Sequence, residues 1–335
     1  MTPAMPPIPV QRAPQHGAAL GGVTHSRYGD IDEQAAALTG WHQRYLQLSR
    51  GRFDGTVQRL QLDGVGLFIE DLHQSVHQTG WVRPDVFAIG VPLAVEGDAR
   101  FCGLAASADT LHVFSGRSGF EFRSPQRHVM IGIEMDRPLY EAHVAPAAGE
   151  HAAAGLHHAD PAVLGELRGF LVDLFQSAGP VAEGQGEGHA PLRKQVRTQL
   201  LDRIALAMAP REAAPAERHA RATSGQSALV VRATEYVASR LGDPPSVGEL
   251  CEVLGVSRRT LQSAFQVCWG MGPLAWLTTL RLNAVRRRLK SAASVTDAAT
   301  EFGFWHFGHF AGDYQALFGE CPSHTLRRHR HSGGH

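Results

Sequence analysis

One sequence pattern occurs twice in the C-terminal part of the chain, and this repeat restricts the possible folds more than any other feature. Ser246 and Ser294 lie 48 residues apart, and Gly255 and Gly303 have the same separation. Four later pairs lie 49 residues apart: Leu261 and Phe310, Phe265 and Tyr314, Gly270 and Gly319, and Pro273 and Pro322. A repeat of this length predicts two copies of one supersecondary unit.

Each copy has the pattern of a helix, a tight turn and a second helix. The hydroxyl of Ser246 or Ser294 can cap the free N–H groups at the start of the first helix. Gly255 and Gly303 can adopt the left-handed conformation that ends a helix without strain. One such match also fits any capped helix pair in a helical core. Two copies at a fixed spacing favour two DNA-binding helix-turn-helix units, and we call the second helix of each unit its reading helix.

A single helix is predicted between the two copies, from Pro273 to Leu289, with proline in its first turn. About 17 residues at roughly 1.5 Å each span about 25 Å. Successive major-groove faces of DNA lie roughly 34 Å apart. A linking helix of this length can therefore set the two reading helices into neighbouring turns of one DNA face.

The region from Gln226 to Arg330 resembles the double helix-turn-helix domain of the AraC/XylS family of bacterial transcription regulators. The matching segments are Leu250 to Phe265, Pro273 to Leu289 and Ala298 to Ser323. The resemblance implies that the partners are double-stranded promoter DNA and RNA polymerase. It also implies that the N-terminal part is a cupin-like sensor and dimerisation module.

The first reading helix is expected to start at Arg258. Leu261 and Phe265 are four residues apart, so we expect both to face the core. The outward positions that become candidate base-reading residues are Arg258, Arg259, Gln262 and Ser263. The resemblance assigns base reading to the last three, and arginine suits guanine whereas glutamine suits adenine. Family members often carry arginine where this chain has Ser263, so reach into the groove is shorter here.

The second reading helix offers fewer polar side chains. With Phe310 and Tyr314 in the core, its outward positions include Gly308, Ala311 and Gly312, which offer no side-chain donor to a base. The remaining candidates are His306, Phe307 and His309 for bases, and Trp305 for phosphate together with Ser257 of the first unit. Trp305 and Phe307 could equally be core aromatics. We therefore expect the second reading helix mainly to anchor the protein.

Positive charge is concentrated in the half of the chain that contains the repeat. From Ser227 onward there are 12 Lys and Arg against 8 Asp and Glu, although the whole chain has 32 of each. On the linking helix, Arg281, Arg287 and Arg288 are expected to contact phosphate, which supplies most non-specific DNA affinity. The alternative is that this run is only a solvated face.

The N-terminal part has the pattern of a β domain followed by two helices, so the fold class expected for the whole chain is α+β. Between Thr56 and Tyr140, short alternating runs are separated by turn signals at the spacing of a sandwich or barrel. Ile31 to Leu48 is expected to be a short helix. The expected division is disordered residues 1–28, a β-sandwich or cupin-like sensor domain at 29–209, a linker at 210–226, an all-α DNA-binding domain at 227–330 and a tail at 331–335.

Two amphipathic patterns follow the β domain, at Pro161–Phe175 and Leu192–Met208. Both apolar stripes can pack on the sheet. Alternatively, a sandwich with two such helices has more apolar surface than it can easily cover, so one stripe forms a dimer face. On this second interpretation the protein is a homodimer.

The sequence contains no common motif of a catalytic, metal or phosphate site. The strand segments lack a His-x-His pair, and the chain has no CxxC pair and no Gly-rich phosphate loop. We therefore expect no enzyme activity, no cofactor and no metal. Side chains that could line a sensor pocket, or equally fill a core, are Trp81, Arg83, Phe87, Phe101, Phe114, Phe120 and Phe122. Arg117, Arg123 and Arg127 suit either an anionic effector or a solvated surface.

These observations predict a dimeric, ligand-responsive transcription regulator that acts as an activator. No apolar run approaches the ~20 residues that span a membrane. The first stretch, Met1 to Gln15, is rich in proline and lacks the apolar segment of a signal peptide, so a cytoplasmic protein is expected. The alternative is a regulator whose N-terminal part only dimerises or binds a protein partner, without a small-molecule site. The sequence does not identify an effector.

Overall fold

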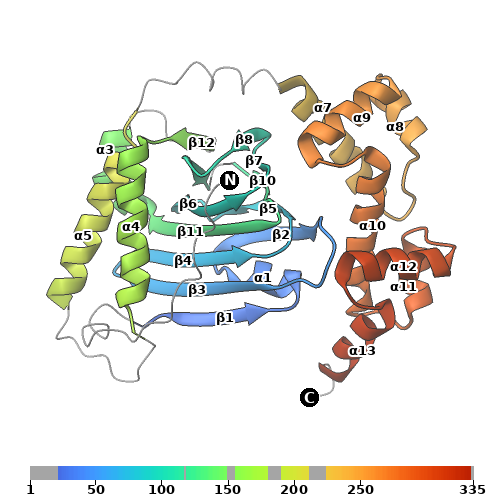
Figure 1. Cartoon of the computed structure of the whole chain (residues 1–335), viewed down its shortest axis with the longest axis horizontal. Helices are drawn as coiled ribbons and strands as arrows, with labels where there is room; N and C mark the ends of the chain where they lie inside the picture. The colour runs from blue at the N-terminus through green and yellow to red at the C-terminus, as the bar shows by residue number, and fades with distance from the viewer. Residues whose placement is uncertain (1–21, 117, 149–154, 180–189, 211–223, 333–335) are drawn as a thin grey trace, which may run out of the picture.

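The computed structural model describes residues 22–116, 118–148, 155–179, 190–210 and 224–332. A β-rich N-terminal part is followed by a helical C-terminal part, so the α+β expectation is confirmed (Figure 1). The stretch expected to be disordered and the expected linker fall largely outside the described residues. Where they are described, residues 24–28 form a strand and a helix already starts at Ser224, so both expectations are wrong at these edges.

The β-rich part consists of two antiparallel sheets. The first contains β1 (Thr24–Tyr28), β3 (Gly55–Leu62), β4 (Val65–Leu72), β6 (Val86–Glu96), β9 (Thr110–Ser115), β11 (Arg127–Asp136) and β12 (Gly155–His158). The second contains β2 (Trp41–Gln47), β5 (Val76–Val82), β7 (Ala99–Phe101), β8 (Leu104–Ala106) and β10 (Phe120–Arg123). The strand orders are β1-β3-β4-β11-β6-β9-β12 and β2-β5-β10-β7-β8.

Helices accompany the sheets and then make up the C-terminal part. The N-terminal part has α1 (Ile31–Ala37), α2 (Arg137–His143), α3 (Ala145–Ala148), α4 (Pro161–Ser177) and α5 (Ala190–Ala207). The C-terminal part has α7 (Ser224–Ala238), α8 (Val247–Leu254), α9 (Arg258–Trp269), α10 (Pro273–Leu289), α11 (Val295–Glu301), α12 (Phe307–Phe318) and α13 (Pro322–Ser332). Among the described residues, no helix combines the length and the apolar character needed to cross a membrane.

The apolar stripes of α4 and α5 pack on the seven-stranded sheet of their own molecule. Leu164, Leu171 and Leu200 are fully buried in one cluster with Ile131 and Ile133 of the sheet. Figure 1 shows α4 and α5 on the side of the sheets opposite the C-terminal helices. Most of each stripe is therefore covered by the molecule's own sheet, and the large apolar side chains of α5 that are exposed in the part described are Leu192 and Leu206.

Aromatic side chains fill the space between the two sheets. Phe114 lies 4.7 Å from Trp41, 4.9 Å from Phe120 and 5.1 Å from Phe101, measured between ring centroids. These rings belong to one buried cluster that also includes Phe122. The phenylalanines that could have lined a sensor pocket are thus core residues. Trp81 differs, because its side chain is exposed and stacks on His42.

The segment expected to be one helix, Ile31 to Leu48, contains a helix and a strand. Helix α1 ends at Ala37, and Gly40 takes a positive φ of 88° before β2 begins at Trp41. Strand β2 then pairs along its length with β5, which the sequence patterns did not predict. Both strands bury polar side chains, so the apolar alternation that marks a strand is weak in them. Strands β7 and β8 are joined by a turn at Cys102 and Gly103, both of which have positive φ angles.

The linking helix α10 docks on β2 through reciprocal hydrogen bonds. The Asn283 side-chain oxygen accepts from Gln47 N at 2.9 Å, and Asn283 Nδ2 donates to Gln47 O at 3.0 Å. The Gln47 side chain donates to Leu317 O of α12 at 2.7 Å. All these atoms are buried, so each hydrogen bond satisfies a polar group that water cannot reach.

Ion pairs extend this contact to the start of α1. Arg287 Nε donates to Asp32 at 2.9 Å, and Lys290 Nζ lies 2.6 Å from Asp30 and 2.8 Å from Asp32. Burial acts to raise the pKa of Asp30, but its hydrogen bond with Lys290 and the nearby cationic charges outweigh burial and lower that pKa. We call the set Asp30, Asp32, Gln47, Asn283, Arg287 and Lys290 the docking contact. It holds the two parts of the chain in one arrangement.

Two buried histidines lead to a prediction about acid stability. His112 and His128 have no hydrogen-bond partner among the described residues, and burial lowers the pKa of each to about 3. Between pH 6.5 and 3 the unfolded chain binds protons that the folded chain does not, so stability is lost as the pH falls below 6.5. From pH 6.5 to 5 the loss should be on the order of 2 kcal/mol per histidine. Urea unfolding at several pH values measures it.

His128→Leu should make this pH dependence shallower. His25→Leu is the matched control, because His25 lies exposed on β1. Equal pH dependence in the two variants would contradict the prediction.

Candidate nucleic-acid interface

The first helix-turn-helix unit, α8 and α9, has the caps that the sequence predicts. Ser246 Oγ accepts from Glu249 N at 3.1 Å, and Gly255 ends α8 with φ 67° in the left-handed region. Ser257 Oγ then accepts from Thr260 N at 3.1 Å at the start of α9. The side-chain cap and the glycine together fix the angle between the two helices.

The second unit, α11 and α12, repeats this construction with one difference. Ser294 Oγ accepts from Asp297 N at 3.0 Å, and Gly303 is again left-handed with φ 72°. Helix α12 starts at Phe307. The residue before it, His306, occupies the N-cap position, but its side chain makes no capping hydrogen bond. The backbone N–H groups at this helix start therefore lack a side-chain cap, and such groups favour an anion.

Helix α10 contributes to the cores of both units. Trp276 and Leu277 pack in the cluster of the first unit, beside Leu261 and Phe265. Leu282, Val285 and Leu289 pack in the cluster of the second unit, beside Phe310 and Tyr314. The expected linking helix Pro273–Leu289 is confirmed with the same bounds. Because it lies in both cores, it fixes the separation of the two reading helices.

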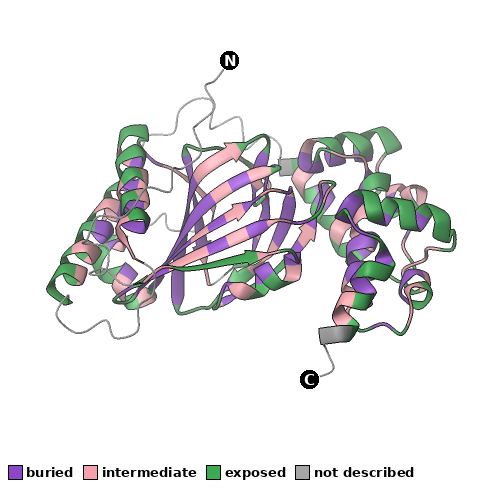
Figure 2. Ribbon diagram, turned by 60° about the horizontal axis from the view of Figure 1, so that its bottom comes forward, coloured by how far each residue is buried: buried purple, intermediate pink, exposed green. Residues whose placement is uncertain are grey.

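The expected outward side chains of both reading helices are exposed. On α9 these are Arg258, Arg259, Gln262 and Ser263, while Leu261 and Phe265 are fully buried. On α12 and just before it they are Trp305, His306, Phe307 and His309. Trp305 is 71% exposed and Phe307 42%, so the alternative that they are core aromatics is wrong. Figure 2 shows exposed residues along the outer helices of the C-terminal part.

Sequence reasoning missed one exposed polar residue on the first reading helix, Thr260. Thr260 is exposed, and its hydroxyl lies 2.8 Å from Ser257 Oγ at the helix start. The amide of Gln262 lies over Gly272, where a Cβ would sit 2.7 Å from Nε2. The serine and threonine at the start of this helix were a sequence signal for Thr260. The position of the predicted Gln262 over Gly272, in contrast, follows only from the tertiary packing.

The arginines of α10 are not left free for phosphate. Arg281 Nε donates to Phe302 O at 2.8 Å, and its guanidinium stacks on Phe304. Arg288 Nε lies 2.6 Å from Glu301. Arg287 belongs to the docking contact, where it also donates to Tyr45 O. The sequence could not show this, because Asp32 and Tyr45 lie more than 200 residues away.

Comparisons with known proteins agree with this geometry. A model of a helix-turn-helix domain matches residues 250–328. An XylDLEGF operon transcriptional activator of Pseudomonas putida is 34% identical over 103 residues, which are 30% of this chain and 31% of that protein. The chain therefore spans about a third of the length of the curated relatives it matches first. The C-terminal part of the chain is therefore a helix-turn-helix domain of the AraC/XylS type.

Two solved structures of the same family are similar to the C-terminal part. One, named a "probable AraC family transcriptional regulator" of Rhodopseudomonas palustris, is 35% identical and covers 30% of this chain and 97% of that one, with a TM-score of 0.29. The other, an AraC-type regulator of Chromobacterium violaceum, is 25% identical and covers 32% and 96%, with a TM-score of 0.30. Both similarities thus extend over about a third of this chain.

Arg259→Ala tests direct base reading by the first reading helix. We expect binding to a preferred site to weaken by about 1–3 kcal/mol and preference at one base pair to relax, because a guanine would lose a bidentate partner. Arg232→Ala removes the same charge from the exposed face of α7 and should change little. Titration of each protein variant against the preferred DNA site and against single-base variants of that site measures these changes in affinity. Equal weakening on random DNA would make Arg259 a phosphate contact.

Arg287→Ala tests whether the docking contact persists on DNA. A phosphate contact contributes about 0.9 to the slope of log affinity against log salt. If Arg287 stays with Asp32, we expect the slope to be unchanged by the substitution. A slope that flattens by about one unit would show that the two parts separate on DNA and that Arg287 then binds phosphate. Fluorescence anisotropy over a salt series measures the slope.

Proposed function

We propose that the protein is a sequence-specific DNA-binding transcription regulator that acts as a homodimer, activates transcription and responds to a small molecule. One observation carries the DNA-binding proposal. Two capped helix-turn-helix units share the core helix α10, and both reading helices keep their outward side chains exposed. The shared helix fixes the separation of the two exposed faces, which reading of neighbouring turns of one DNA face requires.

The proposed DNA contacts differ between the two reading helices. Arg258, Arg259, Gln262 and Ser263 supply polar groups for base edges on α9. On α12, Gly308 and Gly312 have open space around them and no side chain to offer. His306, Phe307 and His309 then supply base contacts, and Trp305 and Ser257 lie at helix starts where phosphate binds. The proposal is that the first helix specifies sequence and the second anchors.

Activation and dimerisation are supported by likeness to the family rather than by a contact in the chain. The matched relative is named a transcriptional activator, which suggests RNA polymerase as a partner. A second copy of the chain would join through the helical side of the N-terminal part, where Leu192 and Leu206 of α5 are exposed. Sedimentation of the full chain measures the oligomeric state, and a monomer at micromolar concentration would remove this part of the proposal.

The filled interior of the β sandwich favours a second candidate function for the N-terminal part. Its aromatic residues pack on one another as core. A module that only dimerises or binds a protein partner, with no small-molecule site, fits that filled interior. Metabolite-dependent changes in the affinity of the full chain for its preferred DNA would favour the responsive regulator.

Selection of binding sites from random DNA tests the DNA-binding proposal. We expect the full chain to return a site that is sharply specified over the turn read by Arg259 and Gln262, and loosely specified one helical turn away. His306→Ala should weaken all selected sites by a similar factor. A second turn as sharply specified as the first would refute the inequality of the two helices, and no enrichment at all would refute sequence-specific binding.

A further inference from the structure

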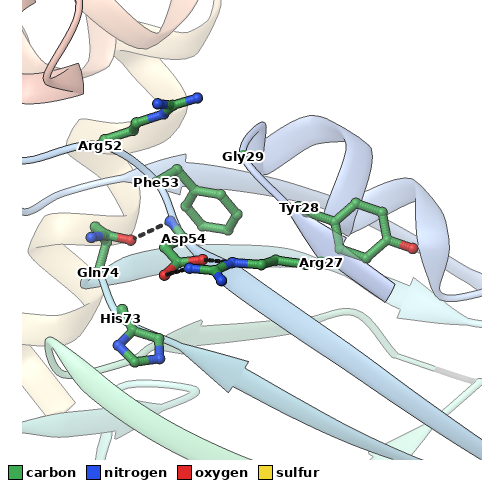
Figure 3. Close-up of a pocket in the computed structure, with 8 residues that line it drawn as sticks. All are labelled: Arg27, Tyr28, Gly29, Arg52, Phe53, Asp54, His73 and Gln74. Atoms are coloured by element: carbon green, nitrogen blue, oxygen red, sulfur yellow. Dashed lines mark hydrogen bonds and ion pairs between the residues drawn. The ribbon is translucent and has the colours of Figure 1, made fainter. Parts of the chain in front are cut away.

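A hollow of the N-terminal part has charged groups that are already paired. Figure 3 shows the side chains of Arg27 and Asp54 facing each other there. Arg27 donates twice to Asp54 at 2.7 Å, and the Gln74 side chain accepts from Asp54 N at 2.9 Å. These polar groups satisfy one another, so they offer little to a ligand. The second reading helix, α12, differs because large apolar side chains at its start are exposed.

The two reading helices have the same length, so they can be compared position by position. Helix α9 spans Arg258–Trp269 and α12 spans Phe307–Phe318, and corresponding positions lie 49 residues apart. At the four base-reading candidates of α9, the corresponding residues of α12 have no polar side chain: Phe307 corresponds to Arg258, Gly308 to Arg259, Ala311 to Gln262 and Gly312 to Ser263. The second reading helix therefore presents an apolar face where the first presents hydrogen-bonding groups.

Two aromatic residues at the start of α12 are not used by the core. Trp305 is 71% exposed and Phe307 is 42% exposed. The neighbouring Phe304 fills the turn instead, because its ring packs 5.1 Å from that of Phe310 and carries the guanidinium of Arg281 at 4.1 Å. Exposed large apolar side chains that lie together mark a surface that meets a partner.

The two glycines of α12 have no structural role in the fold. A Cβ at Gly308 or Gly312 would meet no neighbouring atom within 4 Å, and neither glycine has a positive φ. Glycine inside a helix is destabilising relative to alanine, so the fold itself would favour a side chain at Gly312. A helix face without side chains lets the backbone approach a partner closely. The glycines therefore suit close contact between α12 and the floor of a groove.

The chemistry of the major groove identifies what such a face can recognise. Base edges there present hydrogen-bond donors and acceptors, and the apolar group among them is the 5-methyl group of thymine. An apolar face gains nothing from the polar groups, whereas it removes a methyl group from water. The exposed histidines of α12, His306 and His309, correspond to Ser257 and Thr260, which lie outside the four base-reading candidates of α9.

We propose that the second reading helix recognises thymine through its 5-methyl group. The rings of Phe307 and Trp305 cover methyl groups, and Gly308 and Gly312 let the helix come close enough for this contact. The inference rests on the proposed function and deepens it, because it names the base and the chemical group behind the weak preference expected in the second turn of the site.

Deoxyuridine tests the methyl contact, because it differs from thymine only in lacking the methyl group. The probe is the duplex that the full chain selects, with deoxyuridine in place of each thymine of the second turn. We expect affinity to fall about two- to fivefold for each contacted thymine, the size expected for one buried methyl group. In the turn read by Arg259 and Gln262, the same replacement should change affinity less than about twofold, since hydrogen bonds dominate there.

Two results of this titration would overturn the proposal. One is unchanged affinity when deoxyuridine replaces the thymines of the second turn. The other is a second turn that is selected without thymine.

Substitution of the aromatic residues assigns the contact to them. Phe307→Ser should bring the ratio of affinities for thymine and deoxyuridine DNA close to one, because the ring that covers the methyl group is lost. Trp305→Ser is the second variant and should lower the same ratio. Leu274→Ser is the matched control, because it removes an exposed leucine at the start of α10 and should leave the ratio unchanged. A wild-type ratio in both aromatic variants would overturn the proposal, since the methyl effect would then arise from DNA shape.

A random-sequence duplex, made with thymine or with deoxyuridine throughout, separates this inference from the proposed function. Specific binding to the selected DNA without a methyl effect removes only the thymine assignment. Equal affinity for selected and random DNA removes the proposed function. A lower affinity for the random deoxyuridine duplex would still support the methyl contact in that case, and equal affinity for the two random duplexes would remove it as well.

Discussion

The orientation of the C-terminal part depends on a buried polar contact, the reciprocal hydrogen bonds between Asn283 and Gln47. These bonds join α10 to β2, and the ion pairs of Asp30 and Asp32 with Lys290 and Arg287 extend them to α1. Hydrogen bonds are directional, and a buried group that loses its partner is costly. The contact therefore selects one arrangement of the two parts more sharply than apolar packing alone.

Helix α10 carries this contact on one face while its other faces fill two cores. Its apolar residues fix the spacing of the reading helices, and its polar residues fix their placement on the sheet. The basic side chains of the helix serve the fold of the molecule, because Arg286 is buried against Asp30 and Glu320. Exposed positive charge remains at the start of the first reading helix, where Arg258 and Arg259 lie.

Docking also creates a cleft between the two parts of the chain. The sandwich closes its interior with interlocking aromatic rings, whereas this cleft, lined by Arg123, Ser227 and Cys268 among others, lies where the five-stranded sheet meets α7 and α9. Arg123 belongs to strand β10, and Cys268 and Gly270 of the C-terminal part lie close to its guanidinium.

The sequence by itself determined the local elements of the C-terminal part. Serine caps, left-handed glycines and residues four apart act within a few positions, so Ser246, Gly255, Leu261 and the whole of Pro273–Leu289 were predictable. Strands β2 and β5 were not, because they bury polar residues that only pairing with a distant strand satisfies. Tertiary structure alone decided that Arg287 meets Asp32 and that Arg123 faces a cleft, since such partners lie far apart in the chain and leave no periodic pattern.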